Sequence, residues 1–252
     1  MRLLLGIVLI VIIGRVQGVD SWHKSRHFPR GNLILGYETQ CEEFGENATV
    51  PHLIDEVERG VNVINWFSIN LARNVTEMEI KFGLNATCIA SVAKTLREKH
   101  LPTTHLVTIG GWNAPHPDTS FNGTEWWQFW KKWNDETISR PELGFAGFEG
   151  IDWDLEGHNN PENPGNVFTL EVIDIMGTMS QAAKRDGYLV TLVPAQSYLE
   201  PYMSGFSRNL LHNYTFYHPE FNYHGVNSYA PLLAKYDSQS GVNAPTFDLV
   251  DV

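Results

Sequence analysis

Positive charge, cysteine and long apolar runs are all scarce in this chain of 252 residues. Its 18 lysines and arginines are outnumbered by 29 aspartates and glutamates, which gives a formal net charge of −11. This excess disfavours nucleic acid and anionic membranes as partners, because both are negatively charged themselves. A neutral polymer such as a polysaccharide meets no such objection. No linker, low-complexity tract or internal repeat divides the chain, so its length fits one large globular domain.

The longest apolar run, Leu3 to Ile13, follows Arg2 and is too short to cross a bilayer, which takes about 20 residues in a helix. Small residues follow at Val16 and Gly18, where a signal peptidase cleaves. This pattern predicts a signal peptide over residues 1–18 and a secreted, extracellular protein that passes through the endoplasmic reticulum, with no membrane attachment after cleavage. An uncleaved signal anchor is the alternative.

Two further features agree with export. Five Asn-x-Ser/Thr sequons after a signal peptide indicate a glycosylated secreted protein. The sequons lie at Asn47, Asn74, Asn85, Asn122 and Asn213. The only two cysteines, Cys41 and Cys88, suit a compartment that permits disulfides. They could bridge the loop after the first strand to the second helix or stay unpaired, because sequence alone does not test the geometry.

Strands and helices alternate along the chain with little between them. We expect strands over residues 32–37, 61–69, 103–109, 145–156, 188–194 and 221–229. We expect helices from Pro51 to Gly60, after the capping residue Asn85, and over 124–138, 166–185 and 207–212. Such repeated units indicate a parallel sheet covered by helices. The tryptophans of 124–138 have helical spacing, which favours packing on the sheet over binding sugar.

The segment from Gly147 to Gly157 carries the most information about function. Three carboxylates occupy positions 152, 154 and 156, with apolar residues between them. Side chains on a strand alternate between its two faces, so this spacing directs all three acids to one side. Like charges held close together raise the pKa of at least one member, and a carboxyl that stays protonated near neutrality can act as a general acid. The alternatives are a solvated polar strand face and a divalent-cation site.

Residues 149–156 resemble the DGxDxDxE signature on the fourth strand of family 18 glycoside hydrolases, the chitinases and their relatives. Glu149 replaces the first Asp of that signature and is out of phase with the inward acids, so we interpret it as structural. Residues 106–112 look like the third-strand SxGG motif, with Thr for Ser. Residues 226–229 look like the sixth-strand motif that ends in a substrate-contacting Tyr. The motifs occur in the family's order, over roughly residues 32–231.

The resemblance implies an α/β fold, a TIM (β/α)8-type barrel, with residues 19–252 as its catalytic domain. It implies a retaining hydrolase of β-1,4-linked N-acetylglucosamine polymers such as chitin, in which the substrate's own 2-acetamido oxygen is the nucleophile. Glu156 is then the general acid, Asp154 orients the acetamido group, and Asp152 shares a proton with Asp154.

The resemblance also places Tyr229 on the acetamido oxygen. Gly110 and Gly111 let the backbone approach the site closely, since a side chain there would intrude. Gln196 and Asn227 match polar positions that line the cleft in plant-type members. No cofactor or metal is implied. The implied partner is an oligosaccharide or polysaccharide that contains N-acetylglucosamine, bound by a monomer.

Two other functions remain open. A chitinase-like lectin would bind carbohydrate without cutting it, although such relatives usually lack the acid that Glu156 supplies. An endoglycosidase acting on N-glycan cores would use the same machinery in a different cleft.

The barrel is expected to be incomplete in this chain. Only 23 residues follow Tyr229, whereas a strand–helix–strand unit takes ~30. We therefore expect a barrel truncated after about six strand–helix units, in a gene product that continues beyond Val252.

Overall fold

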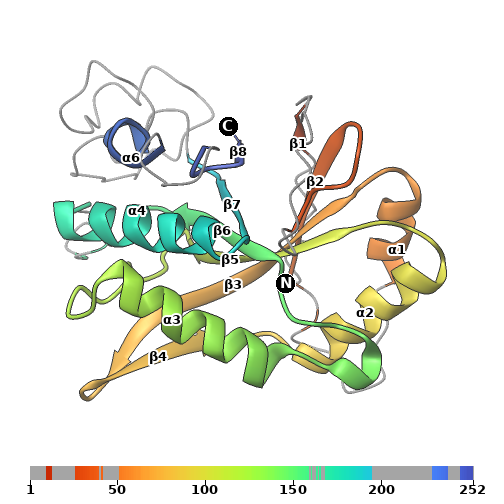
Figure 1. The fold of residues 1–252 in the computed structure, drawn as a ribbon, viewed down its shortest axis with the longest axis horizontal. Helices are drawn as coiled ribbons and strands as arrows, with labels where there is room; N and C mark the ends of the chain where they lie inside the picture. Colours follow the sequence, from red (N-terminus) through yellow and green to blue (C-terminus); the bar gives the residue numbers. More distant parts are fainter. Residues whose placement is uncertain are drawn as a thin grey trace.

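A computed structural model describes most of the chain as one curled sheet flanked by helices (Figure 1). The described residues are 26–39, 41, 51–158, 160, 163, 165, 168–194, 229–237 and 245–251, together with the backbone of 10–12. Most of the predicted signal peptide lies outside them. Its residues Ile10–Ile12 form strand β1, which pairs antiparallel with β2 (Leu33–Glu38). The signal peptide itself stays a prediction.

Six neighbouring strands of the described sheet run parallel in chain order. They are β2, β3 (Val63–Asn74), β5 (Thr104–Gly111), β6 (Gly150–Leu155), β7 (Leu189–Leu192) and β8 (Leu249–Val250). The helices between them are α1 (Pro51–Glu58), α2 (Ala86–Glu98), α3 (Gly123–Trp133), α4 (Leu170–Arg185) and α6 (Tyr229–Tyr236). The sheet curls into part of a TIM-type barrel, which confirms the predicted fold class.

The helices begin and end where local chemistry predicts. Pro51 opens α1, and Gly60 follows its end with a φ of 123°, a conformation that suits glycine. Asn85 caps α2, since its side-chain oxygen accepts hydrogen bonds from two backbone N–H groups at 3.0 Å. No helix in the described part of the chain combines the length and the apolar character that crossing a membrane requires.

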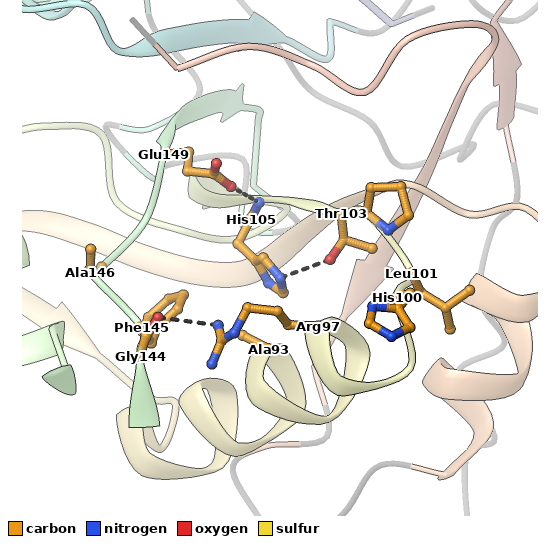
Figure 2. A pocket seen from close by; sticks show the side chains of 12 residues that line it. Ala93, Arg97, His100, Leu101, Thr103, His105, Gly144, Phe145, Ala146 and Glu149 are labelled. Carbon is orange, nitrogen blue, oxygen red and sulfur yellow. Dashed lines mark hydrogen bonds between the residues drawn. The ribbon is translucent and has the colours of Figure 1, made fainter. Parts of the chain in front are cut away.

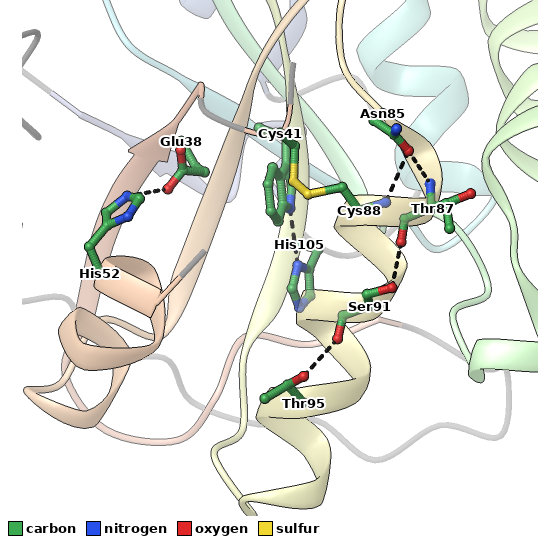
Figure 3. The surroundings of a disulfide bond; sticks show 10 residues. Glu38, Cys41, His52, Asn85, Thr87, Cys88, Ser91, Thr95 and His105 are labelled. Atoms are coloured by element: carbon green, nitrogen blue, oxygen red, sulfur yellow. Dashed lines mark hydrogen bonds and ion pairs between the residues drawn. A yellow bond between two sulfur atoms is a disulfide. The ribbon is translucent and has the colours of Figure 1, made fainter. Parts of the chain in front are cut away.

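A disulfide joins Cys41 to Cys88, and it ties the segment after β2 to the first turn of α2 (Figure 3). The two Cα atoms lie 5.7 Å apart, within the usual range for a disulfide. Of the two alternatives that the sequence left open for these cysteines, the bridged one is correct.

The tryptophans of α3 pack into the core, as their helical spacing predicts. Trp126, Trp127 and Trp130 are buried, and the rings of Trp127 and Trp130 stack with centroids 4.9 Å apart. The Trp126 indole N–H donates to the Asp118 carbonyl, and the Trp127 indole N–H donates to the Asp186 carboxylate. These rings therefore hold α3 against its neighbours and are closed to a sugar.

Two hydrophobic clusters fill the two faces of the sheet. The larger one lies between the sheet and the helices and includes Ile151, Trp153 and Leu155 of β6. The smaller one lies on the inner face of the sheet and consists of Leu33, Leu35, Val63, Leu106 and Leu189. Because these leucines and the valine come from the first halves of their strands, they form an apolar floor beneath the C-terminal strand ends.

A hairpin that the sequence pattern did not predict extends β3. Strand β4 (Glu77–Phe82) pairs antiparallel with the second half of β3, from Ile69 opposite Phe82 to Asn74 opposite Glu77. The alternate residues Met78, Ile80 and Phe82 pack on the core, in agreement with the period of two for a strand.

The predicted end of the sixth strand, Tyr229, is wrong. Tyr229 is the first residue of α6, and the strand that pairs with β7 in parallel is β8. Helix α6 is stabilised by its contact with α4, where the Tyr236 ring packs on Gly177 and its hydroxyl bonds to Asp174. The remainder of the predicted strand, residues 221–228, and the predicted helix 207–212 lie outside the described residues.

Candidate active site

The three acids occupy one face of β6 and the region just beyond its end, as predicted. Asp152 and Asp154 lie within the strand, and Glu156 follows its last residue. Apolar side chains alternate with them and point to the helices, where the Trp153 indole N–H donates to the Ser180 hydroxyl of α4 at 2.9 Å. The alternation of a strand thus separates a carboxylate face from a packing face.

Asp152 is fully buried and surrounded by hydroxyl donors. Thr108 and Thr191, its register partners on β5 and β7, both donate to its carboxylate, and Tyr37 of β2 donates from 3.3 Å. Burial raises the pKa of Asp152 to about 6, and the three hydroxyls act against that rise. The sequence motifs single out neither Tyr37 nor Thr191, although both fall on the inward phase of their strands.

The carboxyls of Asp154 and Glu156 lie next to each other on the inner face at the end of β6. Burial raises the pKa of Asp154 well above its ordinary value, and the neighbouring Glu156 carboxylate raises it further. Burial also raises the pKa of Glu156. The pair therefore retains a proton at a pH at which two separate carboxyls would both be ionised. The family resemblance predicts that Asp152 shares a proton with Asp154; the hydroxyls that bond to Asp152 here come from Tyr37, Thr108 and Thr191.

Gly110 and Gly111 are the last residues of β5, directly beside Asp154 and Leu155 of β6. Their φ angles are 109° and 111°, a region that favours glycine. A Cβ atom on Gly110 would lie 2.4 Å from the Asp154 carbonyl oxygen, and one on Gly111 would lie 2.3 Å from the Phe67 ring. The backbone therefore approaches its neighbours closely here. A larger residue would have to displace β6 at Gly110 and the Phe67 ring at Gly111.

Tyr229 lies beside the acids although it belongs to a helix. It is fully buried, and its hydroxyl oxygen accepts a hydrogen bond of 2.9 Å from the Leu155 backbone N–H. Burial raises the pKa of this phenol, and the carboxylate of Asp154 adds to the rise. The tyrosine hydroxyl is thus adjacent to the pair but engaged with the backbone of β6. Gln196 and Asn227 lie outside the described residues.

Glu149 lies at the other end of β6 from Glu156 and has the structural role that we predicted for it. Its Oε2 atom accepts from the His105 backbone N–H at 2.8 Å, and its own backbone N–H donates to the His105 carbonyl at 2.8 Å. The Leu189 N–H donates to the Glu149 carbonyl at 3.0 Å. Glu149 therefore joins the beginnings of β5, β6 and β7.

A pocket of about 580 Å³ opens at that same N-terminal end of the strands (Figure 2). Arg97 of α2 forms one side and donates to the carbonyls of Leu143 and Gly144 at 2.7 and 3.1 Å. Buried His105 forms the back, where Thr103 lies within hydrogen-bonding distance of its ring. Barrel enzymes place catalysis at the C-terminal strand ends, so this pocket is separate from the acid site. The described residues include no cluster of three metal-ligating side chains.

No protein-family model and no curated protein matches this chain. Solved structures similar to it include a family 18 chitinase from Flavobacterium johnsoniae, at 13% identity and a TM-score of 0.35, over 63% of this chain and 45% of that one. A Group IV chitinase from Ostrinia furnacalis in complex with allosamidin is 18% identical, with a TM-score of 0.39 over 64% and 42% of the two chains. A family 18 chitinase from Cycas revoluta in complex with (GlcNAc)3 is 18% identical, with a TM-score of 0.35 over 67% and 48%.

The matched region therefore spans less than half the length of each of these three structures. Because the TM-scores lie below 0.5, the proposed chemistry rests on the site residues themselves.

Proposed function

We propose that this protein is a secreted glycoside hydrolase that cleaves β-1,4-linked N-acetylglucosamine polymers, with residues 19–252 in its catalytic domain. Glu156 is the general acid, and the configuration at the anomeric carbon is retained. The mature protein acts as a monomer and needs no cofactor.

The observation that carries this proposal is the close approach of the Asp154 and Glu156 carboxyls, which follow each other on one face at the end of β6. Hydrolases that use two carboxylates on the sugar hold them about 5–5.5 Å apart when the configuration is retained and about 6.5–9.5 Å apart when it is inverted. Two neighbouring carboxyls on one face of a single strand lie on the same side of a bound sugar and do not flank a glycosidic bond. The nucleophile therefore comes from elsewhere, and a 2-acetamido group on the substrate supplies one.

The reaction then proceeds in two displacements. Glu156 donates its proton to the glycosidic oxygen while the acetamido oxygen attacks the anomeric carbon, which breaks the glycosidic bond and forms an oxazolinium ion. Asp154 accepts a hydrogen bond from the acetamido N–H and stabilises the positive charge. Water, deprotonated by Glu156, then opens the ring from the opposite face. Asp152 lies beneath this pair, and its negative charge favours the positively charged oxazolinium ion.

The surroundings of Tyr229 favour a positioning role for it over direct contact with substrate. Its hydroxyl accepts from the Leu155 N–H, one residue before the acid, and its ring is fully buried. We assign it to holding the end of β6. Gly110 brings the β5 backbone alongside the same segment, against the Asp154 carbonyl.

Secretion is supported by three features together. The N-terminal apolar run and the five sequons are typical of exported proteins, and the Cys41–Cys88 disulfide suits an oxidising compartment. The cleavage after Gly18 stays a prediction, which N-terminal sequencing of the secreted protein tests directly.

The test of the proposal is a comparison of substrates. The protein is incubated with chitin oligomers and, separately, with a high-mannose glycopeptide, and the products are identified by mass spectrometry and their anomers by NMR. Cleavage of the chitin oligomers to β-anomeric products is the expected result. Cleavage of the glycopeptide alone would indicate an endoglycosidase, and binding without cleavage would indicate a lectin. Either outcome would overturn the proposal.

A further inference from the structure

The backbone at Glu156 lies beyond the hydrogen-bond ladder of the sheet. Pairing of β6 with β7 ends at Trp153, whose carbonyl accepts from the Val193 N–H at 2.9 Å. Pairing with β5 ends one residue before the acid, where Leu155 lies opposite Gly111. The sheet therefore directs the acid toward the site but does not determine the position of its backbone.

A histidine from the loop after β5 contacts that backbone directly. The Nε2 atom of His116 lies 2.9 Å from the Glu156 carbonyl oxygen. A carbonyl only accepts, so Nε2 must carry the hydrogen in this bond. The same loop forms a second bond to the same turn, in which the Asn113 N–H donates to the Gly157 carbonyl at 3.0 Å.

The imidazole ring is itself held by an aromatic neighbour. The rings of His116 and Phe168 lie 4.3 Å apart between centroids, and Phe168 is buried immediately before α4. Phe168 in turn lies against Tyr229, whose hydroxyl binds the Leu155 N–H. Tyr229 thus holds the backbone N–H of Leu155, and His116 holds the backbone carbonyl of Glu156. The two bonds lie on either side of the peptide that joins these residues.

We propose that His116 is a positioning residue for the general acid, holding the Glu156 backbone through its Nε2–H so that the carboxyl meets the glycosidic oxygen. This role rests on the proposed function. Proton transfer needs the acid within hydrogen-bond reach of the oxygen, and a displacement of about 1 Å can cost 10²-fold in rate. Loss of the bond therefore lowers the rate of the chemical step and leaves substrate affinity largely unchanged.

Two variants separate the hydrogen bond from the ring contact. His116→Gln keeps an N–H donor at the position of Nε2 and loses the ring, whereas His116→Phe keeps a ring against Phe168 and loses the donor. Hydrolysis of a chitin oligomer is measured for both, with melting temperatures as a check on folding. We expect His116→Phe to lower kcat about tenfold with KM nearly unchanged, and His116→Gln to restore most of kcat. The reverse order, or equal losses in kcat, would overturn the positioning role.

A second measurement does not depend on activity. The carbonyl carbon of Glu156 is observed by NMR in ¹³C-labelled wild type and in both variants. We expect its chemical shift to move in His116→Phe and to return toward the wild-type value in His116→Gln. A shift that is equal in all three proteins would disprove the hydrogen bond. If wild type cleaves no oligosaccharide but the shifts behave as expected, the contact stands and the proposed function fails.

Discussion

The hydroxyl of Thr191 donates a hydrogen bond to Asp152, its register partner on the neighbouring strand. Thr108, the register partner on the other side, donates to the same carboxylate at 3.0 Å. Burial raises the pKa of Asp152 to about 6, and these hydroxyls hold it below the value that burial alone would produce. Asp152 is therefore a buried acid whose charge depends on donors from both adjacent strands.

Asp152 should make the fold more stable in acid than at neutral pH. Its pKa is about 6 in the folded protein against a reference value of 3.8, so the folded state binds the proton more tightly. The resulting stabilisation is fully present below the reference value and is lost as the pH rises through about 6, a change of about 3 kcal/mol. We expect the free energy of unfolding of wild type, relative to Asp152→Asn, to grow by up to this amount between pH 7 and pH 4 in urea titrations.

The comparison with Asp152→Asn also removes an opposing effect. Burial lowers the pKa of His105 to about 4, so the folded protein loses stability as the pH falls from 6.5 toward that value. His105 is present in both proteins, and its contribution cancels in the difference. A difference that stays flat between pH 7 and pH 4 would contradict the raised pKa of Asp152.

Gly110 should be far less tolerant of substitution than a glycine of the same backbone conformation elsewhere. Gly31 has a φ of 108°, and a Cβ added there would meet no atom within 4 Å, so Gly31→Ala carries only the conformational cost, about 1–2 kcal/mol. Gly110→Ala adds a clash with the Asp154 carbonyl, which should cost roughly a further 1–3 kcal/mol. Urea denaturation of both variants measures this difference. Equal losses in the free energy of unfolding would show that Gly110 is not packed tightly against β6.

Glycans should occupy Asn74 more completely than Asn85. Asn74 lies at the exposed tip of the β3–β4 hairpin, next to Val75, which is 85% exposed. Asn85 is half-buried, and its side chain caps α2 beside the disulfide, where a glycan would crowd the fold. Enzymatic deglycosylation in H₂¹⁸O followed by peptide mass spectrometry reports occupancy at each site. Occupied Asn85 with bare Asn74 would contradict this placement, and an unglycosylated cytosolic protein would contradict secretion.

The sequence predicts the arrangement of the acids well because it depends on one strand alone. A period of two is enough to place Asp152 and Asp154 on one face and Trp153 on the other. The hydroxyl partners of Asp152 depend on how three strands align, and a single chain carries little information about that register. Thr191 and Tyr37 could have been proposed from the inward phase of their strands, but not paired with a particular acid.

The predicted end of the sixth strand, at Tyr229, shows where this kind of reasoning fails. Residues 221–229 have the aromatic and β-branched composition of a strand, yet Tyr229 begins a helix that packs on α4. The strand that continues the sheet, β8, covers only Leu249–Val250, too short for a periodic pattern to be recognised. The contact of His116 could not be predicted either. Its partner is a backbone carbonyl, which every residue has, so no residue type in the sequence indicates it.

The central claim is that Glu156 is the general acid, and the rate of chitin-oligomer hydrolysis by Glu156→Gln tests it most directly. Glu149→Gln is the matched control, since it makes the same change at the other end of β6 and keeps an oxygen to accept from the His105 N–H. We predict that Glu156→Gln lowers kcat by about 10²- to 10⁴-fold while oligosaccharide binding and folding persist, because an amide cannot supply the proton. Glu149→Gln should keep most of the wild-type rate. Hydrolysis by Glu156→Gln at close to the wild-type rate would contradict the account.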